Sequence, residues 1–201
     1  MSRGKGLLLV TMEPPADLEG EFNDWYDTEH FPQRRALPGF ESASRWVCLE
    51  GWPRWLALYD LASASALETD AYRAVSGPNS TPWSRRILPR TVGRMRIVAE
   101  QVVPGGALSF APQKVSRLLL ARYPEASHRV KDVAQALAHS LKDAGLLQIR
   151  LFAALEPAGS ELWAIAEFDR PATAATLVGT AGNAAGCGAD LFNLYASYHR
   201  D

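Results

Sequence analysis

The sequence predicts an α+β fold in which one pattern of elements, β-α-β-β-α-β, occurs twice along the chain. The first copy covers residues 6–103 and the second covers residues 114–199. Between them lies a segment rich in glycine, proline and small residues, which is typical of a linker. These observations predict a first unit at 1–104, a linker at 105–113 and a second unit at 114–201.

Each element of the first copy follows from its local pattern. Leu7 to Met12 is a short apolar run that predicts a buried strand. After Asp17, apolar side chains at three- and four-residue spacing predict an amphipathic helix, and Pro32 should end or restart it. The remaining elements are strands at 40–49 and 55–61, a helix that starts near Ser65 and stops at Gly77-Pro78, and a strand at 94–103.

The second copy shows the same order with weaker signals. Ser127 begins a helix with apolar residues on one face, and Gly145 ends it. An alanine-rich helical stretch follows Pro171. The strands are expected at 115–123, 149–155, 162–168 and 191–198.

This order of elements is that of the ferredoxin-like split β-α-β unit. Such a unit carries both helices on one face of its sheet, so the other face must be covered, and the second copy is the obvious cover. We therefore predict two ferredoxin-like β-α-β-β-α-β units packed sheet to sheet as a pseudo-dimeric α+β barrel around a shared cavity. The alternative is that each unit pairs with another chain.

Composition excludes several classes of protein. The formal net charge of -1 argues against nucleic-acid binding, which needs a basic surface. No apolar run is long enough to span a membrane. Two cysteines make neither a disulfide framework nor a metal cluster, which is typical of a cytoplasmic protein. We expect a monomer with an internal pseudo-dimer, or a homodimer of such chains, that binds a small organic molecule.

One segment resembles a known family. The motif is Glu21-Phe22-Asn23-Asp24-Trp25-Tyr26-Asp27-Thr28-Glu29-His30-Phe31-Pro32, followed by Pro38-Gly39-Phe40. It resembles the dimeric α+β barrel superfamily and is most similar to its EthD-like branch, as is Thr81-Pro82-Trp83-Ser84-Arg85-Arg86. The resemblance covers the first half, and in the second half only the order of elements matches. Because the superfamily includes isomerases, polyketide cyclases, cofactor-free monooxygenases, haem-degrading enzymes and chlorite dismutases, the resemblance does not fix the reaction.

The candidate catalytic residues are His30 and Tyr26. They are four residues apart and would lie on one helical face at the edge of an apolar cavity. An imidazole there is expected to titrate near neutrality and could act as general acid or base. The resemblance implies the same role, since some relatives use this helix position for acid–base chemistry. Two alternatives stay open: His30 could only contact a ligand, or could hydrogen-bond the backbone where the helix breaks.

Six further residues are candidates for substrate binding. Arg45 and Arg96 alternate with apolar residues on predicted strands, and a guanidinium inside a cavity would need an anionic ligand. The alternative is that these arginines reach the rim or pair with local carboxylates, just as Glu29 could pair with a nearby arginine. Aromatic walls suit a flat ligand, although aromatic residues are more often core. The candidates are Phe22, Glu29, Arg45, Trp46, Tyr59 and Arg96.

Two hypotheses about function follow. The first is a cofactor-independent isomerase, cyclase or monooxygenase that transfers a proton on a small aromatic, lactone or polyketide-like compound. The second is a non-catalytic small-molecule-binding or accessory protein with the same cavity. Neither requires a cofactor, and no histidines or cysteines have metal-ligand spacing. Because the aromatic, histidine-bearing motif occurs only once, the cavity is expected in the first half alone.

Overall fold

The computed structural model describes residues 4–157 and 159–199 of the 201-residue chain. Its long strands are β1 (Gly6–Glu13), β2 (Phe40–Glu50), β3 (Trp55–Leu61), β4 (Val92–Val103), β5 (Arg117–Tyr123), β6 (Leu146–Glu156), β7 (Leu162–Phe168) and β10 (Leu191–Ser197). They form one closed barrel in the order β1-β3-β2-β10-β5-β7-β6-β4. All the neighbouring pairs are antiparallel.

The two halves of the barrel have the same topology. The first-half strands run β4-β1-β3-β2 around the barrel, and the second-half strands run β10-β5-β7-β6. In both halves the fourth strand of the unit comes first, followed by the first, the third and the second. The halves meet at two seams, where β2 pairs with β10 and β4 pairs with β6. The predicted pseudo-dimeric barrel of two ferredoxin-like units is therefore confirmed, and it closes within one chain.

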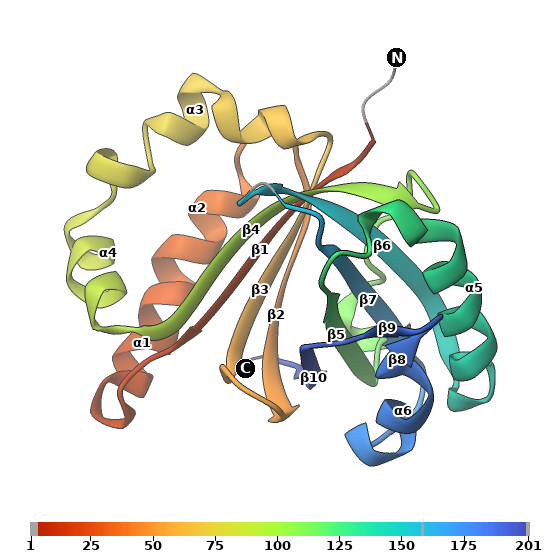
Figure 1. Cartoon of the computed structure of the whole chain (residues 1–201). Helices are drawn as coiled ribbons and strands as arrows, with labels where there is room; N and C mark the ends of the chain where they lie inside the picture. The colour runs from red at the N-terminus through yellow and green to blue at the C-terminus, as the bar shows by residue number, and fades with distance from the viewer. Residues whose placement is uncertain (1–3, 158, 200–201) are drawn as a thin grey trace.

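The helices lie on the outside of the barrel (Figure 1). Helices α1 (Glu19–Trp25), α2 (Phe31–Arg35), α3 (Asp70–Arg73) and α4 (Pro82–Ile87) cover the first-half sheet. Helices α5 (Val130–Leu141) and α6 (Ala174–Ala181) cover the second-half sheet, next to a short hairpin of β8 (Asn183–Ala184) and β9 (Cys187–Gly188). Each sheet thus has helices on its outer face and the other sheet on its inner face.

The inside of the barrel is packed with side chains, which corrects one expectation. Successive residues of a strand point to opposite faces, so Leu7 and Leu9 of β1 enter the barrel while Leu8 faces the helices. The interior is filled by large side chains from both halves, including Trp46, Phe152, Trp163 and Tyr195. The prediction of a shared cavity inside the barrel is wrong, because both inner faces are apolar and bulky enough to meet.

The predicted helix from Ser65 to Gly77 is also wrong in form. The segment is a series of short turns, with 3₁₀ turns at Ala64–Glu68, Gly77–Asn79 and Leu88–Arg90 around α3 and α4. Thr69 caps α3 by accepting a hydrogen bond from the backbone N–H of Tyr72. Proline residues within or before the later turns lack the backbone N–H that a continuous helix needs. We refer to residues 64–90 as the arch, because this irregular segment bridges over the sheet.

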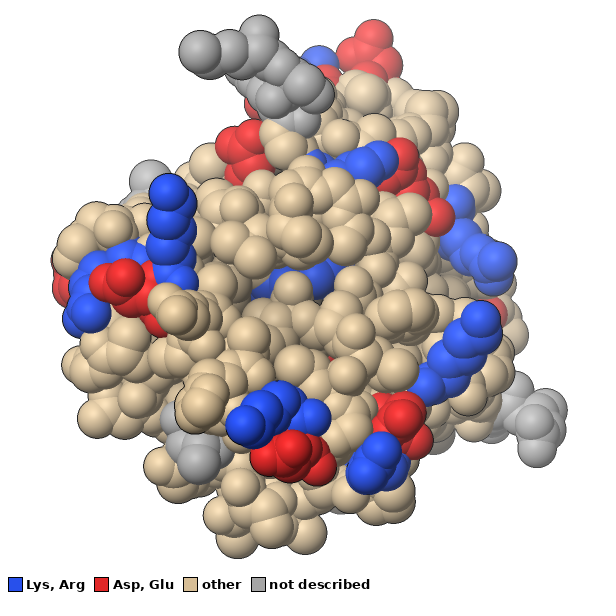
Figure 2. Space-filling view, turned by 90° about the vertical axis from the view of Figure 1, so that its right-hand side faces the viewer, with Lys and Arg blue, Asp and Glu red and all other residues tan. Residues whose placement is uncertain are grey.

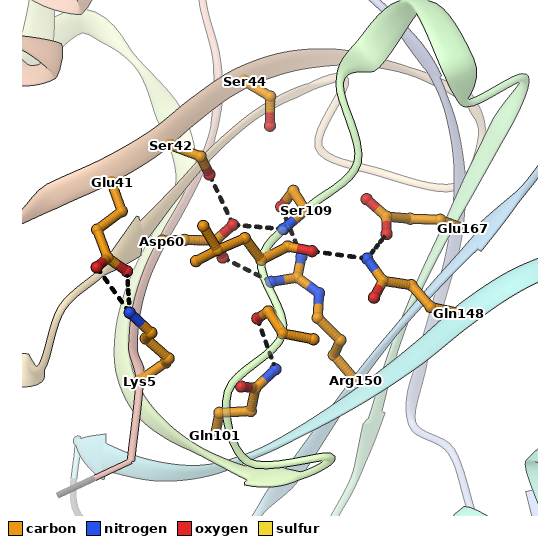
Figure 3. A network of polar contacts seen from close by, with 12 residues as sticks. Lys5, Glu41, Ser42, Ser44, Asp60, Gln101, Ser109, Gln148, Arg150 and Glu167 are labelled. Atoms are coloured by element: carbon orange, nitrogen blue, oxygen red, sulfur yellow. Dashed lines mark hydrogen bonds and ion pairs between the residues drawn. The ribbon is translucent and has the colours of Figure 1, made fainter.

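The linker between the halves is fixed to one end of the barrel by buried polar groups (Figure 3). Arg150 of β6 pairs with Asp60 of β3 at 2.6 Å, and both side chains are almost fully buried. Ser109 of the linker donates its backbone N–H to Asp60 at 2.7 Å and accepts from Arg150 through its hydroxyl at 2.6 Å. The pair therefore joins the first half, the linker and the second half at one point.

The surface carries small groups of opposite charges. Figure 2 shows the side of the second half, where basic and acidic side chains lie next to each other on a largely uncharged surface. Arg122 with Asp190 and Arg129 with Asp132 are two of the ion pairs in this half. Within residues 4–157 and 159–199, no helix has both the length and the apolarity needed to cross a membrane.

Candidate functional site

A cavity of about 760 Å³ lies between the outer face of the first-half sheet and the arch. Leu8, Val10 and Met12 of β1 give it an apolar wall, and the arch contributes Tyr72 and Leu88 on the opposite side. The space exists because the short turns of the arch do not pack down on the sheet as one continuous helix would. Its volume is in the range of small-molecule sites.

His30 reaches this cavity from an unusual turn in the first helix. Residues Tyr26–His30 form a π-helical turn between α1 and α2, in which the N–H of Phe31 donates to the carbonyl of Tyr26. Such turns occur often at functional sites, because the extra residue redirects the side chains around it. Pro32 does not end the helix, because it stands in the first turn of α2 where its missing N–H is not needed.

The imidazole of His30 is enclosed by aromatic rings. Its centroid lies 4.4 Å from that of Trp25 and 5.3 Å from that of Tyr26. Its Nδ1 atom is buried without a hydrogen-bond partner among the described residues. Burial, together with the positive charges of Arg34 and Arg45, lowers the pKa of His30 to about 3. The ring is therefore neutral at neutral pH, and the expectation that it titrates near neutrality is wrong.

Arg34 follows His30 by one helical turn and also lines the cavity. Its side chain is buried, and Nη2 donates to the carbonyl of Val75 in the arch at 2.8 Å. The guanidinium carbon lies 5.2 Å from the centroid of Tyr72, a cation–π contact. Burial lowers the pKa of Arg34 from its ordinary value, but an arginine remains charged in proteins.

Polar atoms without partners gather on this cavity. His30 Nδ1, Arg34 Nη1, Tyr59 OH and Ser76 Oγ are all buried, and none has a hydrogen-bond partner among the described residues. All four residues line the cavity, although they come from three separate parts of the chain. Buried polar groups in folded proteins nearly always have partners, so we expect a polar ligand or bound water to supply them here.

A chain of hydrogen bonds holds the arch over the cavity. Thr81 donates to Glu29 Oε1 at 2.5 Å and lies 2.9 Å from the hydroxyl of Ser84, which accepts from Trp25 Nε1 at 3.1 Å. Thr81 also caps α4, because its side chain accepts from the N–H of Ser84. Glu29, predicted to bind substrate, thus contacts Thr81 and anchors the arch to the first helix.

Three other predicted site residues pack behind His30. Phe22 and Tyr26 are buried between the first helix and the sheet, and the Tyr26 ring lies 4.2 Å from the guanidinium carbon of Arg45. Arg45 forms an ion pair with Asp27 and donates to Asn23 Oδ1 at 2.8 Å. Burial raises the pKa of Tyr26 to about 12 despite the two nearby arginines. These residues support the helix, and the cavity-lining residues of the described chain do not include them.

The last three predicted residues lie in two places. Trp46 is in the barrel interior, where its Nε1 donates to Ser44 at 2.8 Å, so it has no access to the cavity. Tyr59 lines the cavity, and burial raises its pKa well above 10. Arg96 lines it too, while donating to Glu156 across the β4–β6 seam at 2.9 Å. The structure therefore brings His30, Tyr59 and Arg96 together and places the other five predicted residues elsewhere.

Sequence reasoning missed the polar residues of the arch and Arg34. Arg34 is four residues after His30, and this spacing was available as a signal, but Pro32 between them suggested that the helix had ended. Ser76 and Tyr72 lay in a segment interpreted as one regular helix, whereas the structure has short turns there that orient side chains differently. Nothing in the local pattern of residues 72–76 identifies them as cavity residues.

The corresponding space in the second half is filled. Leu137 and Leu141 of α5 and Leu177 of α6 pack with Phe168 against that sheet. Tyr123 lies in the same cluster and donates its hydroxyl to the carbonyl of Ala181 at 2.6 Å. Regular helices with large apolar side chains can approach the sheet closely, which the arch of the first half does not do.

Among residues 4–157 and 159–199, no group of three histidine, cysteine or acidic side chains is placed to hold an ion. His30 is the only histidine among the described residues that line the cavity.

Comparison with known proteins finds similar solved structures but no similar sequences. No family model and no curated protein sequence matches the chain. Among solved structures, an anthrone oxidase-like protein aligns with a TM-score of 0.69 and 12% identity, covering 98% of this chain and 92% of the other. A candidate monooxygenase from Lactobacillus acidophilus aligns with a TM-score of 0.61 and 7% identity, covering 97% and 93%. Chlorite dismutase from Candidatus Nitrospira defluvii aligns with a TM-score of 0.60 and 12% identity, covering 100% and 93%.

These alignments cover nearly all of both chains, so they include the two halves and the closure of the barrel. At identities this low, similarity establishes the fold and leaves the reaction open. The closed eight-stranded barrel, the repeated strand order and the solved structures agree. The chain therefore has the dimeric α+β barrel fold, with both halves of the barrel supplied by a single polypeptide.

Proposed function

We propose that the first-half cavity is the active site of a cofactor-independent enzyme that transfers a proton on a small aromatic, lactone or polyketide-like compound. The observation that carries the proposal is the set of four unpartnered buried polar atoms on one apolar cavity. Such atoms are costly to bury for structural purposes alone, whereas a substrate with oxygen atoms would pair with them. We also assign the site to the unit at residues 1–104 and regard 114–201 as a structural unit.

In this proposal His30 carries the proton. A nitrogen of the neutral imidazole accepts a proton from the carbon next to a substrate carbonyl, and the electron pair left behind forms an enolate. Return of the proton to another carbon completes an isomerisation. In a cyclisation the enolate carbon instead forms a bond to a second carbonyl carbon of the substrate, and the oxygen of that carbonyl takes the proton. The nearby positive charge of Arg34 favours the negative charge as it develops.

The low pKa of His30 is compatible with this role only when an anion is present. The cations Arg34 and Arg45 disfavour a further positive charge on the ring. The enolate formed by the reaction would offset that repulsion, because opposite charges in a poorly solvated site attract strongly. Tyr26 packs against the imidazole and acts here as a positioning residue.

The same pKa favours a second candidate, a binding protein without catalysis. A histidine whose pKa is about 3 is a weak base, and it could serve only as a neutral hydrogen-bonding group. Such a protein would bind the same class of compound and release it unchanged. An assay that measures proton transfer directly separates the two candidates.

The test is hydrogen–deuterium exchange on enolisable aromatic ketones and lactones, with anthrone as the first probe. Anthrone is chosen because an anthrone oxidase-like protein shares the fold. In deuterated buffer without oxygen, NMR should show that the protein accelerates exchange of the anthrone methylene protons. His30→Gln should lower the accelerated rate by about 100-fold or more, and the exposed His139→Gln in α5 serves as the control.

With oxygen present, the same probe tests oxidation. Each anthrone would lose its two methylene hydrogens, and one dioxygen would give one oxygen atom to the quinone carbonyl and one to water. Oxygen consumption equal to anthraquinone formation would identify an oxygenase among the proton-transfer reactions. If no compound in the panel exchanges faster with the protein than with His30→Gln, the enzyme proposal fails and the binding candidate replaces it.

A further inference from the structure

The charges around the cavity are not balanced. Arg34, Arg85, Arg94 and Arg96 all line it, together with His30. Among the described residues that line it, none is an aspartate or glutamate. Arg85, Arg94 and Arg96 are exposed to water, and Arg96 also pairs with Glu156. Arg34 is different, because it is buried deep in the wall.

A comparison among the buried arginines shows what Arg34 lacks. Arg34, Arg45 and Arg150 have exposed fractions of only 7%, 5% and 1%. Arg45 pairs with the carboxylate of Asp27, and Arg150 pairs with that of Asp60. No carboxylate among the described residues pairs with Arg34, whose only hydrogen bond is to a neutral carbonyl. Burying a cation without an anion is costly, so an anion from outside the chain would complete this site.

The donors around Arg34 suit a carboxylate group. Arg34 Nη1, Tyr59 OH and Ser76 Oγ are the unpartnered donors. Tyr59 is close enough to Arg34 for the arginine's charge to affect its ionisation, and Ser76 follows Val75, whose carbonyl accepts from Arg34. A carboxylate has two oxygens with about four acceptor positions, enough for all three donors.

The rest of the cavity suits an aromatic ring. The β1 wall of Leu8, Val10 and Met12 is apolar, and Tyr72 and Leu88 face it from the arch. A flat apolar body can lie along this wall while its charged end reaches Arg34. We propose that the ligand of this cavity is an aromatic carboxylic acid, bound as the carboxylate through Arg34, Tyr59 and Ser76. This inference rests on the proposed function, from which it takes the location of the site, and it adds the chemical class of the substrate.

The test compares acids with amides of the same shape. Benzoate, 1- and 2-naphthoate and anthracene-2-carboxylate are titrated into the full chain by calorimetry beside the matching carboxamides. Each pair has nearly equal size and apolar area, so a difference in affinity reports the charge. We expect at least one acid of the panel to bind tenfold or more tightly than its amide.

Variants then locate the charge recognition. Arg34→Met keeps an unbranched apolar side chain but removes the guanidinium, and it should abolish the preference for the acid. Arg35→Met is the matched control, because Arg35 is the next residue, is exposed and lies outside this cavity. Tyr59→Phe and Ser76→Ala should each weaken acid binding several-fold. If Arg34→Met does not fold, these two variants decide the question.

Two results would overturn the inference. One is that no acid in the panel binds more tightly than its amide. The other is that the preference survives in Arg34→Met, or in the two hydroxyl variants together. These results are independent of catalysis: acid-selective binding without proton exchange would refute the enzyme proposal alone. Proton exchange without acid selectivity would refute this inference alone.

Discussion

A half-buried histidine that stays neutral links the site to the pH dependence of stability. Below pH 6.5 the unfolded chain takes up a proton at His30, whereas the folded protein binds it only near pH 3. Stability contributed by His30 is thus fully present above pH 6.5 and is lost as the pH falls toward 3. The cause is desolvation of the ring together with the charges of Arg34 and Arg45.

The variant His30→Gln removes this proton uptake. Between pH 7 and pH 5, the wild-type protein should lose about 1 to 2 kcal/mol more unfolding free energy than His30→Gln does. Urea denaturation at the two pH values measures the difference. Equal losses in both proteins would mean that the folded state protonates His30 as easily as the unfolded state.

The hydroxyl of Tyr59 gives a second test on the scale of one residue. Because this buried oxygen has no partner among the described residues, its removal should not cost stability. Tyr59→Phe is expected to unfold with a free energy equal to that of the wild type or up to about 1 kcal/mol higher. A clear loss of stability by thermal or urea unfolding would show that the hydroxyl is already hydrogen-bonded in the empty protein.

At the scale of one element, the arch depends on its caps. Short turns have little stability of their own, so Thr81 matters both as the cap of α4 and as the partner of Glu29. Thr81→Val removes both interactions at nearly constant volume and should lower the unfolding free energy by about 1 to 2 kcal/mol.

The control for the arch is Thr28→Val. Thr28 is exposed, and its hydroxyl donates a hydrogen bond within the same helix, to the carbonyl of Asp24. We expect this change to cost less than about 0.5 kcal/mol in urea unfolding. Similar losses in the two variants would show that the arch is not held by the Thr81 contacts.

On the scale of the whole molecule, the two halves should unfold together because the Arg150–Asp60 pair joins them. Burial alone would raise the pKa of Asp60, but Arg150 and the hydrogen bond from Ser42 bring it below its ordinary value. Arg150→Met leaves that carboxylate buried without its cation and should cost about 3 to 5 kcal/mol. The exposed Arg170→Met is the control.

A double variant checks the interpretation of this pair. Adding Asp60→Asn to Arg150→Met removes the unpaired charge, so part of the lost unfolding free energy should return. Calorimetry should show one transition for the wild type, since both halves share the barrel interior. Two separate transitions in the wild type would contradict a single cooperative barrel.

The sequence predicted the topology better than the site. Apolar runs such as Leu7 to Met12 identified the strands, and their repeated order predicted the barrel. The same run is apolar on both faces, however, so periodicity could not tell the barrel interior from the helix-covered side. For that reason Trp46 was expected at the site. Ser76 depends on how the arch crosses the sheet and left no local signal, whereas the four-residue spacing of Arg34 from His30 was a signal that Pro32 obscured.

One polypeptide contains both half-barrels, so the two halves need not have the same sequence, as they must in a symmetric dimer. When two identical chains build such a barrel, every substitution appears twice, so a residue that suits ligand recognition must also be tolerated at the symmetry-related position. Here each side can specialise. In the first half an irregular segment covers the sheet and leaves a cavity that several arginines line. In the second half the helices pack closely on the sheet and form an apolar cluster.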